Sequence, residues 1–314
     1  MKGHGIFMND TISKLFSTFL GNLQLTTNQR EDAQTKYTGV CKTLYPVFYG
    51  GTYTDDAKYL FGSYKTKTHI APMCETQDVD VLFKIDDDTY EQYKDNPAGL
   101  LQKIRHALKD KYKTTETIKV WGKIVLVQFS DNHHNVELLP ALEQGDGTFL
   151  IPNTENGGTW EVFDPRSQVN SFSESNKDTD GKTRGLVQMM KKWVKETATL
   201  SYKSYCIVED VIRYLDVVYD NEVSSVQYDK LVEGFLIFLE NNTPAHLNSQ
   251  KNHIATAKTR VVKAIELAAE GKNIAASQEW RKVFGSYFPL AEKDEIVKSN
   301  PTKIVNPAKP WGWN

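Results

Sequence analysis

The sequence predicts an α+β protein with two lobes, in which a small mixed sheet with helices is followed by a helical lobe. Amphipathic helical patterns open the chain, and strand-like and helical patterns alternate through its first half. Helical periodicity alone then continues to about residue 290. A chain of 314 residues is also long enough for two domains. We expect residues 1–165 to form the mixed lobe and residues 166–314 to form the helical lobe.

Two helices are expected before the first strand. In the first, apolar residues recur at helical spacing over residues 12–20, and Gly21 interrupts the pattern. In the second, Asn28 and Glu31 form a capping-box pattern, and apolar side chains over residues 33–44 share one face.

The remaining elements alternate and then become helical. In order, they are a strand at 78–85, a helix at 97–112, a strand at 118–129, a turn at 130–134 and a returning strand at 135–139 that Pro140 ends. Residues 141–183 are rich in Gly, Asn, Ser and Asp and are expected to form a long connection. Helical stripes follow at 186–194, 207–215, 231–239 and 254–268.

The composition excludes several classes of protein. Lys and Arg number 38 and Asp and Glu number 40, so the net charge of −2 gives no bulk attraction for nucleic acid or an anionic membrane. Cys41, Cys74 and Cys206 lie far apart, which argues against a structural zinc site and a disulfide framework. The sequence contains no signal-peptide pattern at its start and no apolar run of membrane-spanning length. We therefore expect a protein of the reducing cytoplasm.

Two aspartates on the strand expected at 78–85 are the main candidates for chemistry. Asp78 and Asp80 are two residues apart, so both carboxylates lie on one face of a strand. Their repulsion is relieved by a divalent cation such as Mg²⁺, which prefers oxygen ligands. Glu137 lies in an apolar run of another expected strand, and three carboxylates meet if the strands are neighbours, as two-metal phosphoryl transfer requires. The alternative is a solvated strand edge, with Glu137 paired to a lysine.

A Gly-Ser turn precedes this strand. Gly62 and Ser63 offer backbone N–H groups and a hydroxyl, which suit a triphosphate at a helix start. Most Gly-Ser pairs are plain turns. A Gly-Ser turn, an Asp-x-Asp strand and a later acid followed by proline, in that order, are much more specific.

With these motifs in this order, the chain resembles a polymerase-β-type nucleotidyltransferase. More narrowly, it resembles the bacterial CD-NTases, which are related to cyclic GMP-AMP synthase and oligoadenylate synthase. The matching motifs are Gly62-Ser63-Tyr64-Lys65, Asp78-Val79-Asp80-Val81, Val136-Glu137-Leu138-Leu139-Pro140, Met190-Lys191-Lys192-Trp193 and Lys203-Ser204-Tyr205. The resemblance runs from about residue 10 to the C-terminus. It implies a polymerase-β-like catalytic lobe, a helical C-terminal lobe and a long N-terminal helix that bridges the two.

The resemblance implies a metal-binding role for the three acids. Asp78 and Asp80 would bind two Mg²⁺ ions, for which Mn²⁺ can substitute. Glu137 would bind one ion and help to activate the attacking hydroxyl. The family more often has Asp at this third position, so Glu137 keeps the charge on a longer side chain.

The resemblance also implies a set of nucleotide-binding residues. Gly62 and Ser63 would hold the donor triphosphate, and Lys191 would contact it. Tyr205 would stack on the donor base, with Ser204 near the phosphates. From the residues alone, the alternatives are a solvated helix lysine at Lys191 and a core tyrosine at Tyr205.

Four other groups of residues are interpreted from their position in the sequence. His133 and His134 are expected in a solvated turn, and the acids at 86–88 at a polar strand end. Arg166 and Arg184 flank the connection, and either is a candidate nucleotide contact.

The function that the resemblance implies is synthesis of a cyclic di- or trinucleotide second messenger from NTPs, ATP among them, with release of pyrophosphate. The setting would be bacterial anti-phage (CBASS) signalling, with a downstream effector protein activated by the product. No membrane and no obligatory DNA partner is expected, and the enzyme would act as a monomer or with an accessory protein. The alternatives are a linear oligonucleotide-making, tRNA-tailing or protein-nucleotidylating transferase, and an inactive nucleotide-sensing module.

Overall fold

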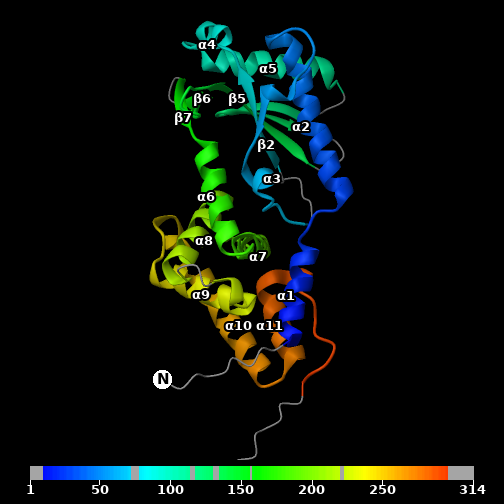
Figure 1. Ribbon diagram of the computed structural model, residues 1–314, viewed down its shortest axis with the longest axis vertical. Helices are drawn as coiled ribbons and strands as arrows, with labels where there is room; N and C mark the ends of the chain where they lie inside the picture. The colour runs from blue at the N-terminus through cyan, green and yellow to red at the C-terminus, as the bar shows by residue number, and fades with distance from the viewer. Residues whose placement is uncertain are drawn as a thin grey trace, which may run out of the picture.

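The computed structural model describes residues 10–71, 78–113, 117–129, 134–155, 158–219 and 223–295. The molecule is elongated and has two lobes (Figure 1). The sheet lobe contains the β-sheet and helices α2 to α5, and the helical lobe contains α1 and α6 to α11. The α+β fold class predicted from the sequence is confirmed.

Seven strands in the described part of the chain form one mixed sheet. They are β1 (Lys58–Leu60), β2 (Asp78–Ile85), β3 (Thr117–Trp121), β4 (Ile124–Gln128), β5 (Asn135–Glu143), β6 (Phe149–Asn153) and β7 (Thr159–Phe163). The order is β1-β2-β5-β4-β3, and β6 and β7 continue from β5. β2 and β5 pair in parallel at the centre, whereas the other pairs are antiparallel.

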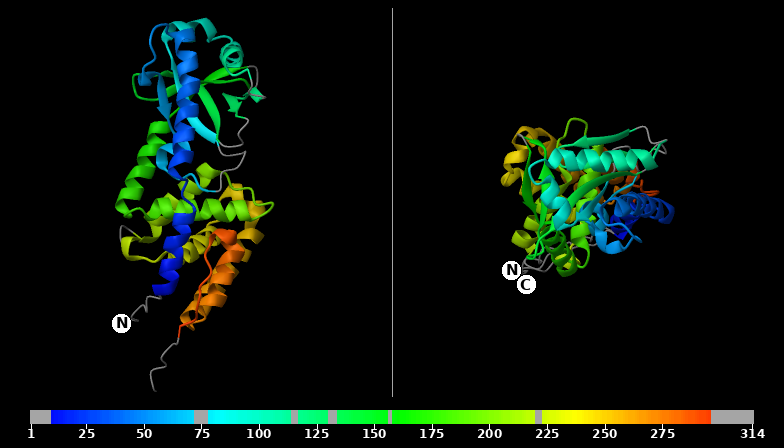
Figure 2. Two further views of the ribbon diagram at one scale, coloured as in Figure 1. Left: turned by 90° about the vertical axis from the view of Figure 1, so that its right-hand side faces the viewer. Right: turned by 90° about the horizontal axis from the view of Figure 1, so that it is seen from above.

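The two faces of the sheet have different roles. Helices α2 (Thr27–Phe48) and α5 (Pro97–Lys111) cover one face of the sheet (Figure 2). On this face, Val81 and Phe83 of β2 enter the main core of the lobe. Leu82 lies on the opposite face, in a smaller apolar cluster. Because side chains alternate along a strand, the even-numbered residues of β2 share the face of Leu82. That face is turned away from α2 and α5.

The remaining helices of the sheet lobe are short, and the helical lobe is built from longer ones. The sheet lobe has α3 (Gly62–Thr66) and α4 (Asp87–Tyr93). The helical lobe has α1 (Asp10–Asn22), α6 (Pro165–Asp178), α7 (Lys182–Glu196), α8 (Ser204–Tyr219), α9 (Tyr228–Asn241), α10 (Lys251–Ala269) and α11 (Asn273–Phe284). None of the helices in the described ranges combines the length and the apolar character needed to cross a membrane.

The N-terminal segment contributes to both lobes. Phe16 and Phe19 of α1 pack against an aromatic cluster from the C-terminal part of the chain, with Trp280, Phe284 and Phe288. The segment after α1 then leads to α2, which packs on the sheet. The chain passes between the lobes a second time where β7 is followed by α6 (Figure 1). We propose the boundary between the lobes at this second passage, at residues 165–166.

Two predictions about local structure are wrong at the level of caps and turns. The capping box of α2 is formed by Thr26 and Gln29, not by Asn28 and Glu31, because the Thr26 hydroxyl accepts from the Gln29 amide and the Gln29 side chain accepts from the Thr26 amide. The strand expected at 118–129 is a hairpin, since Gly122 has a positive φ of 58° and lies in the turn between β3 and β4.

Two longer-range predictions are also wrong. β5 continues through Pro140 to Glu143, because Pro140 is paired with Phe83 in the parallel register and the strand does not need its missing N–H there. The connection expected at 141–183 contains the end of β5, then β6, β7 and the whole of α6. Asp164 caps α6 by accepting from the Ser167 amide, and Pro165 stands at its first turn, so polar residues there form a helix.

Candidate active site

The parallel pairing of β2 and β5 brings the three predicted acids together. In the register of these strands, Asp78 lies beside Asn135 and Asp80 lies beside Glu137. All four residues share the face of the sheet that is turned away from α2 and α5. The Asn135 side chain donates a hydrogen bond of 3.1 Å to the Asp78 carboxylate. The sheet therefore presents three carboxylates at one end of its two central strands.

Burial raises the pKa of each of these acids, and repulsion from neighbouring acids adds to the rise for Asp80 and Glu137. Burial raises the pKa of Glu137 to about 7, and the charges of Asp78 and Asp80 add to the effect. The pKa of Asp80 is raised to about 6 by burial and by Asp78, against the opposing attraction of Lys191. Burial also raises the pKa of Asp78. The fully ionised cluster is therefore unfavourable without positive charge nearby.

The donor chemistry of this cluster fits a hard divalent cation. Three carboxylates supply only oxygen ligands, as Mg²⁺ prefers, and a cation would remove the repulsion that raises their pKa values. In the described ranges, no three His, Cys, Asp or Glu side chains stand close enough together to form a ready-made metal site. The residues that could hold such an ion are Asp78, Asp80 and Glu137.

A tight turn places α3 directly against the carboxylates. Gly62 has a φ of 61°, and a Cβ atom there would lie 2.2 Å from Oδ2 of Asp80. The backbone amide of Ser63 donates to the Asp80 carboxylate, and the Thr66 hydroxyl donates to the Gly62 carbonyl at 3.0 Å. Only glycine combines this backbone conformation with such a close approach. The sequence expectation of a Gly-Ser turn at a helix start is confirmed.

A cavity of about 660 Å³ lies between the two lobes at this point. All eight residues predicted for the site line it: Gly62, Ser63, Asp78, Asp80 and Glu137 from the sheet lobe, and Lys191, Ser204 and Tyr205 from the helical lobe. Their assigned roles remain predictions. The cavity is of the size that small-molecule ligands occupy, and residues of both lobes form its walls.

The helical lobe contributes a buried lysine and an exposed tyrosine to the cavity. Lys191 is 8% exposed, and its Nζ donates to the Thr68 hydroxyl at 3.2 Å. Burial lowers the pKa of Lys191 to about 8, although Asp80 attracts its charge. Tyr205 is 56% exposed at the start of α8, so it is not a core tyrosine. Lys191 is likewise not a solvated helix lysine, and the two alternatives are overturned.

Several residues that line or support the cavity are not among those predicted from the sequence. Asn135 carried a signal, because it stands two residues before Glu137 just as Asp78 stands two before Asp80. The others had no sequence signal and depend on how helices pack; they are Ser167, Gln168, Ser171 and Tyr202.

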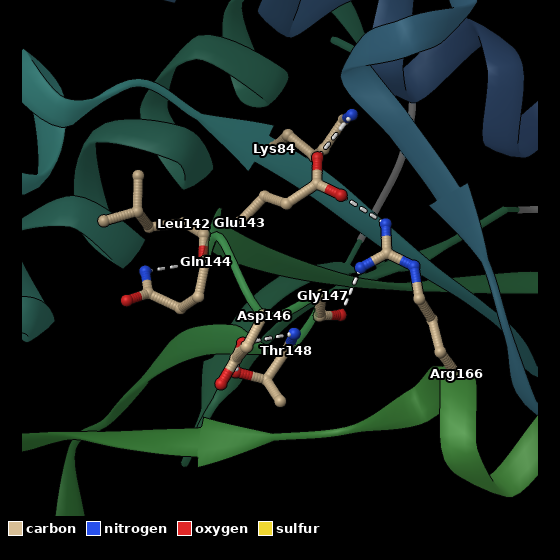
Figure 3. A network of polar contacts seen from close by, with 8 residues as sticks. All are labelled: Lys84, Leu142, Glu143, Gln144, Asp146, Gly147, Thr148 and Arg166. Atoms are coloured by element: carbon tan, nitrogen blue, oxygen red, sulfur yellow. Dashed lines mark hydrogen bonds and ion pairs between the residues drawn. The ribbon is translucent and has the colours of Figure 1, made fainter.

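Arg166 is held in a structural network at the edge of the sheet (Figure 3). Its guanidinium donates to the Glu143 carboxylate and to the Gly147 carbonyl, and it lies over the rings of Tyr59 and Phe149. Lys84 pairs with the same Glu143 carboxylate at 2.9 Å. This network joins the start of α6 to the hairpin between β5 and β6, and Arg166 does not line the cavity.

The other candidates are also placed by their contacts. Arg184 donates from Nε to the Thr66 carbonyl at 3.2 Å. Asp86 caps α4, which agrees with a polar strand end. His134 is fully buried with its Nδ1 3.3 Å from Asp32, so the expectation of a solvated turn is wrong for this residue, because β5 begins directly after it. His133 lies outside the described residues.

A buried histidine beside the cavity predicts a loss of stability in acid. His69 stacks on Tyr64 at 4.6 Å, and burial lowers its pKa to about 4. An unfolded histidine has a pKa near 6.5, so the unfolded chain takes up the proton first as the pH falls. The stabilisation is complete above about pH 6.5 and decreases toward pH 4. Between pH 7.5 and 5, His69 alone should reduce the free energy of unfolding by about 2 kcal/mol.

This prediction can be checked by urea unfolding of the wild type and of His69→Gln at both pH values. Between pH 7.5 and 5, the free energy of unfolding should fall by about 2 kcal/mol less in the variant than in the wild type. His106→Gln is the control, since His106 is exposed on α5. Equal acid losses in the wild type and in His69→Gln would contradict the assignment.

This fold and this cavity define a nucleotidyltransferase, since acids on adjacent central strands and a Gly-Ser turn directly beside them line a space large enough for nucleotides. Residues 11–176 match the family model of the Second Messenger Oligonucleotide or Dinucleotide Synthetase domain, SMODS. The match covers more than half of the chain, and the chain belongs to this family. The resemblance to CD-NTases inferred from the sequence is thereby confirmed.

Individual relatives agree with this assignment. A protein described as a "probable cyclic nucleotide synthase" from Bacillus cereus (strain VD146) is 24% identical over 279 residues, which cover 74% of this chain and 82% of the relative. A cyclic AMP-AMP-AMP synthase from Acinetobacter sp. (strain ATCC 27244 / 9458) is 24% identical over 267 residues, which cover 77% of this chain and 75% of the relative. The solved CdnC:HORMA-deltaN complex from Escherichia coli MS115-1 has the same fold, with a TM-score of 0.64 and 17% identity over 90% of this chain and 98% of that chain.

Proposed function

We propose that this enzyme joins NTPs, ATP among them, into a cyclic di- or trinucleotide and releases pyrophosphate. The observation that carries the proposal is the convergence of all eight predicted residues on one interlobe cavity in a chain of this family. A donor NTP would bind with its α-phosphate beside the carboxylates, and the hydroxyl of an acceptor nucleotide would be held on the opposite side. A second or later transfer would close the ring within the same cavity.

Asp78, Asp80 and Glu137 would hold two Mg²⁺ ions, or Mn²⁺ in their place. Bound there, the ions supply neutralisation of the triphosphate and a lower pKa for the attacking hydroxyl. The chain's own contribution is to hold the three carboxylates on one face of two paired strands. Asn135 supports this by orienting the Asp78 carboxylate through its hydrogen bond.

The triphosphate would be bound by groups from both lobes. Ser63 offers its hydroxyl at the start of α3 on the sheet lobe. Lys191 offers a buried ammonium from the helical lobe, and Thr68 holds that ammonium in place. Charge in a buried position is more effective than charge in water, which suits binding of pyrophosphate as the leaving group. Most of the rate acceleration would come from positioning the two nucleotides and from neutralising the charge of the triphosphate.

Tyr205 would stack on a nucleotide base. Its exposed ring lies at the mouth of the cavity, and stacking on an aromatic ring contributes about 1–3 kcal/mol per base. Tyr205→Ala should therefore raise the KM for NTP by about tenfold or more, with a smaller effect on kcat. Tyr205→Phe keeps the ring and should behave like the wild type in steady-state kinetics. An unchanged KM in the alanine variant would refute the stacking role.

We further propose that the product acts as a second messenger in CBASS anti-phage signalling and activates a downstream effector protein. Use of NTPs as substrates would suit a reaction in the cytoplasm. The net charge of −2 disfavours an obligatory DNA partner. The CdnC relative was solved with a HORMA partner, and we propose that this enzyme works either alone or with an accessory protein of comparable role.

The proposed activity is tested by identifying the product. The purified protein is incubated with each combination of NTPs and Mg²⁺, the reaction is treated with phosphatase, and resistant products are identified by mass. A cyclic product has no terminal phosphate and survives. Pyrophosphate release with only phosphatase-sensitive products would instead indicate a linear or tailing transferase. No pyrophosphate release with Mg²⁺ or Mn²⁺ would favour an inactive sensing module.

A further inference from the structure

Gln188 lies on α7 where the two lobes meet, and its side chain is 2% exposed. Its Nε2 donates to the carbonyls of Lys67 and His69, each at 3.2 Å. Its Oε1 accepts a hydrogen bond of 3.1 Å from Gln24, in the segment between α1 and α2. One buried carboxamide thus connects the helical lobe, the N-terminal segment and the chain that follows α3. Because these three hydrogen bonds of the buried Gln188 side chain all go to other segments, they fix the relative positions of those segments.

The segment that Gln188 holds is continuous with the Gly62–Ser63 turn. Lys67 ends α3 in the left-handed conformation, with a φ of 57°, which is strained for a residue with a side chain. The Thr68 amide donates back to the Ser63 carbonyl at 2.9 Å. Ser63 in turn contacts Asp80 through its own amide. The Lys67 amide also donates to the Ser63 carbonyl, so a shift of the chain at Lys67 would be passed to Ser63 through these two hydrogen bonds.

Gln188 is the central member of a row of three side chains on α7. Arg184 donates to the Thr66 carbonyl, and Lys191 donates to the Thr68 hydroxyl, each at 3.2 Å. Spacings of four and three residues place all three side chains on one face of the helix. Other side chains of α7, such as Met190, are packed in the core of the helical lobe. The position of the turn is thereby set by the helical lobe as well as by the sheet.

We infer that Gln188 is a positioning residue, which holds the Gly62–Ser63 turn at the correct height above the carboxylates for a donor triphosphate. Gln188 itself does not line the cavity, so it acts through the chain that it binds. The inference rests on the proposed function, because it assigns the turn to triphosphate binding. It adds that the affinity for the donor nucleotide depends on how α7 is docked against residues 66–69.

The test compares Gln188→Leu with a matched control, Thr183→Val. Thr183 is also buried on α7, but its hydroxyl bonds to Ser175 and Thr179 on the side of α6. Both variants remove buried hydrogen bonds from the same helix. Only Gln188→Leu leaves the carbonyls of the turn segment without partners. Gln188→Glu, which has the same shape but cannot donate when ionised, is the second variant should leucine prevent folding.

Two measurements separate positioning from stability alone. Hydrogen exchange of the Thr68 and Ala71 amides, measured without nucleotide, should accelerate at least about tenfold in Gln188→Leu and remain unchanged in Thr183→Val. The KM for the donor NTP should rise about tenfold in Gln188→Leu, with a smaller change in kcat and none in the control. A lowered melting temperature with unchanged exchange and unchanged KM would overturn the inference.

A failure of the inference about Gln188 can be distinguished from a failure of the proposed synthesis of a cyclic nucleotide. The exchange measurement needs no turnover, so it reports on the turn even if the wild type makes no cyclic product. An active wild type whose exchange and KM are insensitive to Gln188→Leu would refute the positioning role alone.

Discussion

Replacing Asp80 with asparagine should abolish product formation, with a loss of at least about a thousandfold in kcat/KM. The Asp80 carboxylate accepts a hydrogen bond from the Ser63 amide and is attracted by the charge of Lys191. Asp80 also lies beside Glu137 in the strand register. Metal-assisted charge stabilisation is worth several kcal/mol, and each 1.36 kcal/mol corresponds to a factor of ten. Steady-state assays of pyrophosphate release with Mg²⁺ measure the loss directly.

The same substitution should not destabilise the protein. The folded chain raises the pKa of Asp80 to about 6, so it holds the ionised group at a cost at pH 7. Asparagine keeps the shape and removes the charge, and the melting temperature in metal-free buffer should stay level or rise. Asp88→Asn is the control, since Asp88 is exposed in the first turn of α4. Product formation by a folded Asp80→Asn protein would contradict the role of Asp80.

Gly62→Ala should be the second most damaging change, with a loss of at least about a hundredfold in kcat/KM. The new Cβ would lie 2.2 Å from Oδ2 of Asp80, so either the turn or the carboxylate must move. A displacement of about 1 Å in a catalytic group can cost a factor of about 100. The positive φ adds about 1–2 kcal/mol of strain for a residue with a side chain.

Gly21→Ala is the matched control for this substitution. Gly21 lies in α1, and a Cβ atom there would meet no other atom within 4 Å, so alanine should be neutral or stabilise the helix by about 0.5–1 kcal/mol. Its activity should equal that of the wild type. Urea unfolding and kcat/KM of both variants make the comparison. A Gly62→Ala enzyme with wild-type kcat/KM would show that the turn tolerates movement.

The clustering of the three acids could be predicted from the sequence because strand geometry has a period of two. Asp78 and Asp80 had to share a face once the segment was a strand, and a carboxylate at Glu137, in an apolar run of a nearby strand, had few other uses. For the three acids to meet, the two strands also had to be neighbours in the sheet. The parallel register of β2 and β5 places Asp80 beside Glu137. Local patterns were thus sufficient to predict which acids the sheet brings to the cavity.

The helical side of the cavity could not be predicted in the same way. The contacts of Gln188 and Arg184 to the turn join residues that are about 120 positions apart in the chain, and they depend on the docking of α7. His134 is buried by the placement of β5 and α2 around it, which no local pattern encodes. Residues 165–178 looked like a connection because they are polar, yet a cap and a first-turn proline were enough to start a helix.

The packing of α1 against the C-terminal aromatic cluster has a consequence for synthesis of the protein. Phe16 and Phe19 leave the ribosome first, but Trp280, Phe284 and Phe288 are made only about 260 residues later. At about 5–20 residues per second, α1 waits at least about 13 seconds for these partners, and the part of its apolar face that they cover stays exposed until then. The sheet lobe can form during this interval, since its strands lie between β1 and β7. We therefore expect nascent chains stopped before α11 to bind chaperones through α1, and full-length chains to be released.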